Sequence, residues 1–164
     1  MKQEITEFAE DTIIGFTRAP PDSDFESAIV IGAPSLEMLE GLTRQIKMYL
    51  TTKGHFAEEV SSIEEGIDIK RLATSASLGA IGKSTLVITP EFGPRARFSV
   101  ILTDAVIDVD EPREFDFCKD CNACIEACPA GAITDSGYDR AACEHTRGNI
   151  CVLCIAACPV GKGK

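Results

Sequence analysis

The stretch Cys118-Lys-Asp-Cys121-Asn-Ala-Cys124-Ile-Glu-Ala-Cys128-Pro129 has the spacing C-x2-C-x2-C-x3-C-P. Bacterial ferredoxins use this run of cysteines to bind 4Fe-4S clusters. The tight loop turns the first three thiolates toward three irons of one cluster, whereas the fourth cysteine, which precedes the proline, points away from them. The spacing therefore predicts a 4Fe-4S site whose fourth thiolate comes from another part of the chain.

A second group of cysteines follows the first. Cys151, Cys154, Cys158 and Pro159 repeat the C-x2-C-x3-C-P ending, and Cys143 lies further upstream, which gives C-x7-C-x2-C-x3-C-P. In two-cluster ferredoxins the fourth cysteine of a motif ligates the other cluster. We therefore expect two 4Fe-4S clusters with exchanged ligands: cluster 1 on Cys118, Cys121, Cys124 and Cys158, and cluster 2 on Cys128, Cys143, Cys151 and Cys154.

Three other uses of the cysteines compete with this interpretation. Four disulfides would suit a secreted chain, and nothing in the sequence indicates secretion. Zinc ribbons use pairs of cysteines and need neither the third cysteine at x2 nor the fourth at x3 before a proline. A redox-active C-x-x-C pair would leave the remaining cysteines unexplained. The two histidines, His55 and His145, are not needed as ligands.

The length and composition bound the class of protein. The chain has 164 residues, of which 45% are hydrophobic, so it can bury a core. Its opening segment lacks the pattern of a signal peptide, and no run approaches the roughly 18 apolar residues that a membrane span needs. We therefore expect a soluble protein of the cytoplasm, with no membrane partner.

The charge is unevenly distributed. The net charge is -10, and residues 1–112 contain 10 Lys and Arg against 19 Asp and Glu, whereas residues 113–164 contain 6 against 7. Nucleic-acid binding depends on neutralising phosphates with Lys and Arg, so an acidic chain without a basic stripe is not expected to bind DNA or RNA. The acidic part predicts a solvated surface, or a surface that docks a basic redox partner.

The cysteines also indicate how the chain is divided. They are absent from the first 117 residues and crowd into the rest, and the acidic stretch "DVDEPREFDF" at 108–117 precedes the first of them with a proline inside it. Such a stretch is typical of a linker. We therefore predict two domains: residues 1–112 and residues 113–164.

Hydrophobic patterns predict the elements of the first domain. Apolar residues from Ile5 to Phe16 fall at helical spacing, and "SAIVIGA" at Ser27–Ala33 is typical of a buried strand. Ser35 is a candidate N-cap for a helix that runs to about Lys53 and ends at Gly54.

Further along, "HFAEEV" at 55–60 indicates a strand and "IDIKRLATSASL" at 67–78 a helix, followed by a loop at Gly79–Gly82. The stretches 84–90 and 97–108 indicate two more strands. Strands and helices do not alternate regularly, so the fold class predicted is α+β rather than a doubly wound sheet.

The order "ASLGAIGKSTLVITPEFGPRARFSVILTDAVIDVDEP" at 76–112, followed by the two cysteine motifs, resembles the cobalamin-dependent family of epoxyqueuosine reductases and reductive dehalogenases. The resemblance implies a nitroreductase-like α+β layer that holds a corrinoid, followed by a ferredoxin-like domain whose two 4Fe-4S clusters feed it electrons. It also implies that Gly79, Gly82 and Lys83 lie on a corrinoid-facing loop, with Thr103 and Asp104 near the end of a strand beside it.

The chain departs from this family in two ways. Members are longer at the front, and the queuosine branch adds a helical-repeat domain with a basic surface for tRNA. That branch also has an aspartate in a D-T-x-P sequence as its proton donor, and at this spacing the chain has Glu64 in "EEGID", with no proline following. Glu64 is the only catalytic candidate, and it competes with an ordinary surface glutamate.

Two functions follow from these observations. The chain is either a small electron carrier that relays single electrons from its two clusters to a redox partner protein, or a minimal cobalamin-dependent reductase in its own right. The domain in front of the clusters favours the enzyme, because ferredoxins do not need it. The acidic front part and the missing tRNA module count against a queuosine substrate, and the carrier is the preferred hypothesis. The sequence leaves open whether a homo-oligomer forms and completes a pocket.

Overall fold

The structure is a computed structural model that describes residues 1–60, 67–147 and 151–162. It divides the chain into two compact units: unit 1 comprises Met1–Leu78 and Ala96–Glu114, and unit 2 comprises Gly79–Arg95 and Phe115–Lys164. Unit 2 thus combines the cysteine-rich segment with an earlier segment, 79–95. The domain boundary predicted between residues 112 and 113 stays a prediction.

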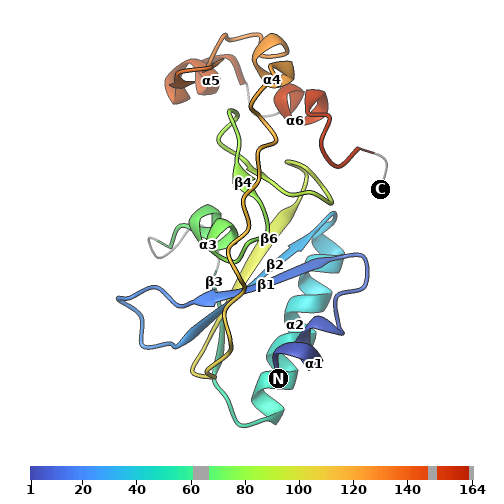
Figure 1. The fold of residues 1–164 in the computed structure, drawn as a ribbon, viewed down its shortest axis with the longest axis vertical. Coiled ribbons are helices and arrows are strands. Elements are labelled where there is room, and N and C mark those ends of the chain that lie inside the picture. Colours follow the sequence, from blue (N-terminus) through green and yellow to red (C-terminus); the bar gives the residue numbers. More distant parts are fainter. Residues whose placement is uncertain (61–66, 148–150, 163–164) are drawn as a thin grey trace. The chain divides into compact units, whose positions relative to one another are not determined.

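Unit 1 is built on an antiparallel sheet (Figure 1). Within the described residues the strand order is β1-β2-β6-β3. The strands are β1 (Ile13–Arg18), β2 (Ser27–Ala33), β3 (Ala57–Val60) and β6 (Arg97–Thr103). Val30 of the central strand β2 pairs with Gly15 on one side and with Val100 on the other. Because these pairs are antiparallel, the α+β class predicted from the sequence describes unit 1 correctly.

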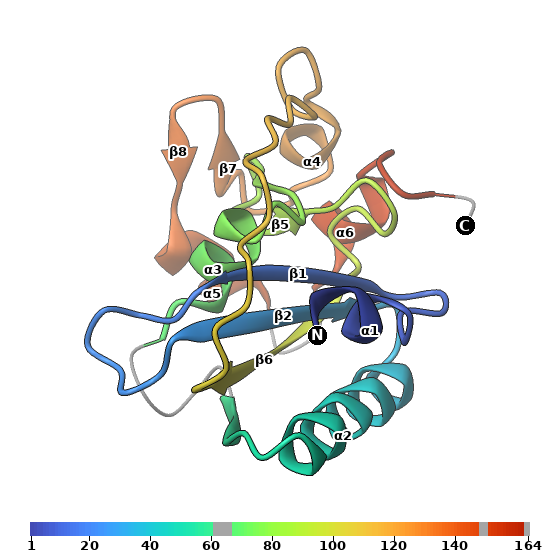
Figure 2. The same ribbon diagram turned by 60° about the horizontal axis from the view of Figure 1, so that its bottom comes forward.

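Helix α2 (Leu36–Thr52) covers one face of this sheet, as Figure 2 shows. It begins where the sequence predicts, because the Ser35 side chain accepts a hydrogen bond of 3.3 Å from the Met38 N–H. It ends before Gly54, whose φ of +87° is a conformation that glycine adopts readily. The core that α2 forms with the sheet includes Phe16, Ile29, Ile31, Leu42, Ile46, Leu50 and Ile101.

Short helix α3 (Ile69–Ser75) and the residues after it pack on β1, β2 and β6. A Cβ on Gly15 would lie 2.4 Å from the carbonyl oxygen of Ala76, so only glycine allows this close approach. The strand β2 therefore has no solvent-facing side, and all seven of its residues are buried. This explains why its sequence is a continuous apolar run instead of an alternating one.

The helix predicted over Ile5–Phe16 is wrong. Helix α1 covers only Lys2–Thr6, and Ile13–Arg18 forms strand β1. Asp11 has a φ of +50°, which interrupts the helical path before the strand. The β-branched run Thr12, Ile13 and Ile14 then favours strand, and the pairing of β1 with β2 supplies the hydrogen bonds.

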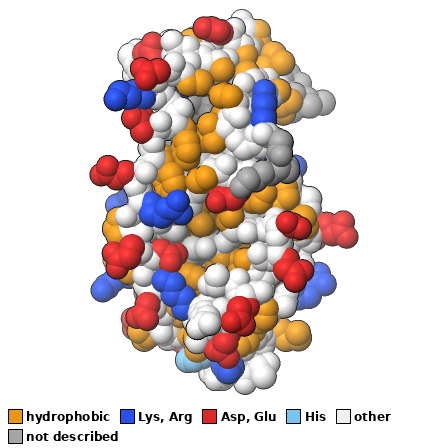
Figure 3. Space-filling model, turned by 45° about the vertical axis from the view of Figure 1, so that its right-hand side comes forward, with side chains coloured by type: hydrophobic (Ala, Val, Ile, Leu, Met, Phe, Trp, Pro, Cys, Tyr) orange, Lys and Arg blue, Asp and Glu red, His pale blue; other side chains and the backbone are white. Residues whose placement is uncertain are grey.

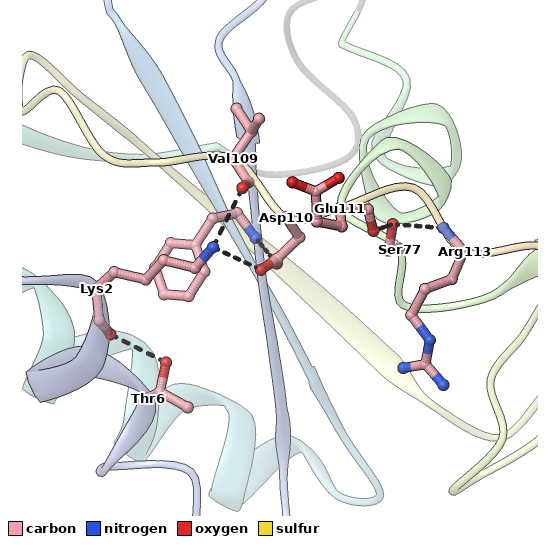
Figure 4. A network of polar contacts seen from close by, with 8 residues as sticks. Lys2, Thr6, Ser77, Val109, Asp110, Glu111 and Arg113 are labelled. Atoms are coloured by element: carbon pink, nitrogen blue, oxygen red, sulfur yellow. Dashed lines mark hydrogen bonds and ion pairs between the residues drawn. The ribbon is translucent and has the colours of Figure 1, made fainter.

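The segment after β6 is tied to unit 1 by polar contacts (Figure 4). Asp110 accepts a hydrogen bond of 2.7 Å from the Phe16 N–H and pairs with the Lys2 ammonium at 2.8 Å. Ser77 donates to the Glu111 carbonyl at 2.8 Å and accepts from the Arg113 N–H at 3.3 Å. The first half of the predicted linker is therefore held by specific hydrogen bonds.

The strand predicted at 97–108 is shorter in the structure, because β6 stops at Thr103. The strand predicted at 84–90 reduces to β5 (Val87–Ile88), which pairs with β4 (Ala80–Ile81) in a hairpin of unit 2. The "GKST" sequence forms the turn of this hairpin: the Thr85 N–H donates to the Gly82 carbonyl, and the Gly82 N–H donates to the Leu86 carbonyl. The loop predicted at Gly79–Gly82 is thus partly strand.

The rest of unit 2 consists of short elements around the cysteines. They are α4 (Ala123–Glu126), β7 (Ile133–Thr134), β8 (Gly137–Tyr138), α5 (Arg140–Arg147) and α6 (Leu153–Ala157). Helices α4 and α6 pack against each other. None of the helices in the described ranges is both long and apolar enough to span a membrane.

Candidate iron-sulfur site

All eight cysteines belong to unit 2, and each is a free thiol. Cys124 lies in α4 and Cys154 in α6, the two helices that pack together. Cys143 lies in α5, and Cys158 is the residue at which α6 ends. The alternative of four disulfides is therefore not what the structure shows.

Cys124 is the centre of the first group of thiols. Its side chain is buried, and burial raises the pKa of the thiol because it disfavours the charged thiolate. The nearby Cys118 and Cys121 raise this pKa further, since a second negative charge at short range is unfavourable. These three cysteines therefore lie close enough to interact, as the C-x2-C-x2-C spacing predicts.

Cys154 is the centre of the second group. Burial again raises the pKa of its thiol, and Cys151 and Cys143 add to the increase. The charges of Cys143 and Cys154 therefore interact, and the assignment of Cys143 to the second cluster stays a prediction. The charge of Cys154 also raises the pKa of Cys124. The two groups of thiols therefore interact across the contact between α4 and α6.

Cys128 has a different environment. Burial alone would raise the pKa of its thiol, but hydrogen bonds from backbone N–H groups outweigh burial and lower it. The donors are Ala130, Gly131, Ala132 and Ile133. Such hydrogen bonds stabilise negative charge on sulfur and are one of the means by which proteins tune the potential of an iron-sulfur cluster.

The β4–β5 hairpin lies against the first group. A Cβ on Gly82 would be 3.1 Å from the Cys118 Sγ and 2.8 Å from the Ile88 Cγ1, so the hairpin passes close to this sulfur. The next residue, Lys83, donates from its Nζ to Asn122 Oδ1 at 2.8 Å and to Asp135 Oδ1 at 2.6 Å. The hairpin is thus fastened to loops on both sides of α4.

Arg95, at the end of segment 79–95, contacts the last cysteine motif. Its guanidinium donates to the carbonyl oxygens of Ile155, Cys158 and Val160 at 3.1, 3.2 and 2.9 Å. The backbones also approach closely here, because a Cβ on Gly93 would lie 2.1 Å from the Val160 oxygen. The segment therefore reaches both cysteine motifs.

The described residues contain no group of three His, Cys, Asp or Glu side chains that could hold one metal ion. A 4Fe-4S cluster requires a different arrangement of ligands, because its four thiolates surround several irons and do not converge on a single ion. The donor set fits such clusters: Cys124 and Cys154 lie on packed helices with further thiols near each, and backbone N–H donors and the Lys83 cation lie beside them.

The other predicted site residues are placed as follows. Gly79 is required by the hairpin, since a Cβ there would lie 2.1 Å from the Ile88 oxygen. Thr103, fully buried at the end of β6, accepts a hydrogen bond from the Ala105 N–H at 3.2 Å. Asp104 accepts from the Phe56 N–H at 3.0 Å and lies 3.2 Å from His55 Nδ1.

Gly79, Gly82 and Lys83 lie in unit 2, whereas Thr103 and Asp104 lie in unit 1. Their assignment to a corrinoid stays a prediction. Glu64 falls outside the described residues. Sequence reasoning did not single out Arg95, Asn122 or Asp135, because their partners are distant in the chain and no local spacing marks them.

Comparisons with known proteins agree with the first cysteine motif. Residues 112–134 match a family model described as a 4Fe-4S binding domain. A tetrachloroethene reductive dehalogenase of Desulfitobacterium hafniense is 35% identical over 111 residues, which cover 66% of this chain and 20% of the relative. An epoxyqueuosine reductase of Bacillus subtilis is 25% identical over 169 residues, which cover 91% of this chain and 41% of the relative.

Solved structures show the same fold. The structure of epoxyqueuosine reductase from Bacillus subtilis has a TM-score of 0.77 at 19% identity and covers 99% of this chain and 66% of its own. A reductive dehalogenase whose structure suggests a mechanism for B12-dependent dehalogenation has a TM-score of 0.74 at 21% identity and covers 90% of this chain and 29% of its own.

The fold and the cysteine site define an iron-sulfur protein. Its homologues are epoxyqueuosine reductases and reductive dehalogenases, and it shares their iron-sulfur core. The chain spans between a fifth and about two fifths of the length of these curated relatives, as the covered shares of 20% and 41% show.

Proposed function

We propose that the protein binds two 4Fe-4S clusters on its eight cysteines and relays single electrons to a redox partner protein. The observation that carries this proposal is the pair of thiol groups, one around Cys124 and one around Cys154, on two helices that pack together. Two adjacent cubane clusters can exchange an electron, and the protein adjusts each potential through burial and hydrogen bonds to sulfur.

The ligand sets follow the exchange expected from the spacing. Cluster 1 takes Cys118, Cys121 and Cys124 from the first motif and Cys158 from the second, whereas cluster 2 takes Cys128 from the first motif and the other three cysteines from the second. The two potentials should differ, because the sulfurs have different surroundings. Cys128 has several backbone donors, and the Cys118 sulfur has the β4–β5 hairpin beside it.

The proposal also concerns location and partners. Thiolate-bound clusters suit a reducing compartment, so we propose the cytoplasm. The net charge of -10 disfavours nucleic acid as a partner. Figure 3 shows acidic and basic side chains interspersed on the face drawn. A protein that carries complementary charge is a better candidate partner than an anionic polymer.

Iron and labile sulfide analysis of anaerobically reconstituted protein tests the proposal. Two clusters require about eight irons and eight sulfides per chain, since each 4Fe-4S cluster has four of each. After reduction, electron paramagnetic resonance should show two interacting signals. About four irons, or bound zinc in place of iron, would contradict the two-cluster proposal. Clusters without reversible redox waves in voltammetry would contradict the relay.

A second candidate function is that of a cobalamin-dependent reductase. It is favoured by one observation, which is that the similarity to epoxyqueuosine reductase extends over 99% of the chain and so includes unit 1, which a ferredoxin would not need. Titration of the cluster-loaded protein with cobalamin tests it. A change in the cobalamin spectrum that saturates at one equivalent is expected for the reductase, and an unchanged spectrum would leave only the electron carrier.

A further inference from the structure

Lys83 is a cation held at a fixed place inside unit 2. Its side chain is 18% exposed, and its Nζ lies 2.8 Å from Asn122 Oδ1 and 2.6 Å from Asp135 Oδ1. Asn122 stands between Cys121 and the first residue of α4, so one of the two anchors belongs to the first cysteine motif itself. The ammonium group therefore cannot move far from that motif without losing both partners.

The position of this cation places it beside the first group of thiols. A Cβ on Gly82, the preceding residue, would lie 3.1 Å from the Cys118 Sγ, so the backbone passes close to this sulfur. The pKa of the Lys83 ammonium is raised, first by the hydrogen bond to Asp135 and in smaller part by the charges of Cys118 and Cys124. The positive charge of Lys83 and the negative charges of these two thiolates therefore act on each other.

The partner of Lys83 does not cancel this effect. The Asp135 side chain is 73% exposed, so water screens its charge, whereas the Lys83 side chain is mostly covered. The two charges of the ion pair thus act on the first thiol group with different strength, and the cation dominates.

A cluster bound by four thiolates gains one more negative charge when it is reduced. A fixed positive charge nearby stabilises the reduced form more than the oxidised form, because Coulomb attraction grows with the charge of the cluster. Net charge around a cluster is one of the properties that set its potential. A largely covered lysine next to one cluster can therefore separate two otherwise similar potentials.

We propose that Lys83 raises the reduction potential of the cluster held by Cys118, Cys121 and Cys124, and so makes it the preferred resting place of an electron in the pair. Lys83 acts on the cluster through its charge and is not a ligand. This inference rests on the proposed function, because it requires both clusters to be present.

Four variants of the full chain test it by potentiometric titration monitored with electron paramagnetic resonance. In K83M the ratio of reduced to oxidised cluster at a fixed potential should fall about tenfold, which corresponds to a shift of about 59 mV for a one-electron couple. K83R keeps the charge and should restore the ratio. D135N removes the neutralising carboxylate and should increase the ratio. K119M removes an exposed lysine next to Cys118 and should change it little.

A charge effect of Lys83 predicts that the ratio of reduced to oxidised cluster falls in K83M and rises in D135N, whereas a purely structural role predicts changes in the same direction. If Lys83 only anchored the hairpin, K83M and D135N would both break the Lys83–Asp135 ion pair and would shift the potential in the same direction, which would overturn the inference. Unchanged potentials with the full iron content would also overturn it and leave the proposed function intact. Wild-type protein that holds no clusters would instead contradict the proposed function. If K83M lost its iron, K83Q would decide, because its amide can bond Asn122 or Asp135 without the positive charge, and a ratio in K83Q equal to that of the wild type would overturn the inference.

Discussion

Arg95 and Cys158 are 63 residues apart in the sequence, and the Arg95 Nη2 donates a hydrogen bond of 3.2 Å to the Cys158 carbonyl oxygen. The same guanidinium donates to the carbonyls of Ile155 and Val160. The last carbonyl groups of a helix have no partner within it, and Arg95 donates to that of Ile155 in α6 and to those of Cys158 and Val160, which follow the last helical residue. Cys158 is thereby held at a fixed point before Pro159.

Replacement of Arg95 should loosen the last cysteine motif. In R95M the carbonyl groups lose three donors, so Cys158 is no longer positioned and the protein should lose the iron of cluster 1 faster under a chelator. R95K keeps the charge but not the fork of donors and should be intermediate. Iron release followed by absorbance checks this. R97M, which changes an exposed arginine of β6, is the control, and equal release in R97M and R95M would contradict the prediction.

Gly82 should be intolerant of a side chain. In G82A the new Cβ would lie 2.8 Å from the Ile88 Cγ1 and 3.1 Å from the Cys118 Sγ, so the hairpin or the cysteine must shift. We expect a lower iron content after reconstitution and a shifted cluster 1 signal. Iron analysis together with electron paramagnetic resonance measures both. A G82A protein with full iron content and wild-type spectra would show that the hairpin does not constrain Cys118.

Gly41 provides a matched glycine with the opposite expectation. It lies in the exposed interior of α2, and a Cβ there would meet nothing within 4 Å. G41A should therefore stabilise unit 1 by about 0.5–1 kcal/mol, because glycine is costly inside a helix. Urea unfolding monitored by circular dichroism measures the change. A lower midpoint in G41A would contradict the prediction.

Local sequence signals predicted those parts of the fold that local interactions determine. The α2 helix has an N-cap at Ser35 and a glycine at its end, and both the helix and the buried strand β2 were correctly predicted. The helix predicted over residues 5–16 was wrong because apolar residues at helical spacing also occur where a short helix is followed by a strand. The pairing of Ile13–Arg18 with β2 decided the outcome, and pairing is a tertiary interaction.

The candidate site likewise has a part that local sequence spacing predicts and a part that depends on distant contacts. The spacing predicts the cysteine ligands, because the short loops that carry them determine where thiolates can point, and their division between two clusters stays a prediction. Lys83 is a predicted site residue for a different reason, because the family resemblance implies that it lies on a corrinoid-facing loop. Its contact with Asp135, 52 residues away, depends on how segment 79–95 packs in unit 2, and the same holds for Arg95. No spacing rule reports contacts of this kind.

The acid stability of unit 1 should depend on Glu4. Hydrogen bonds from the N-terminal ammonium of Met1, from Tyr49 and from Lys53 lower the pKa of this carboxyl from 4.5 to about 2. Because the folded pKa is depressed, the stabilisation is fully present above pH 4.5 and is lost as the pH falls toward 2. E4Q should remove this pH dependence of the urea midpoint. The exposed Glu40 on α2 supplies the control variant E40Q, and equal pH profiles for E4Q and wild type would contradict the prediction.

The exchange of ligands between the motifs can be tested with pairs of cysteine variants. Cys118 and Cys158 are assigned to the same cluster although they lie in different motifs, whereas Cys143 and Cys158 are assigned to different clusters although they lie in the same motif. Two changes within one cluster should cost no more iron than either change alone, while changes in separate clusters should add.

We therefore expect C118A/C158A to retain the iron of cluster 2, and C143A/C158A to retain almost none. Iron and sulfide analysis of the single and double variants gives the comparison, and circular dichroism of unit 1 serves as the control for folding. The reverse result, with cluster content preserved in C143A/C158A and lost in C118A/C158A, would assign each motif to its own cluster. In that case Arg95 would position a ligand of cluster 2, and the loosening expected in R95M would appear in that cluster instead.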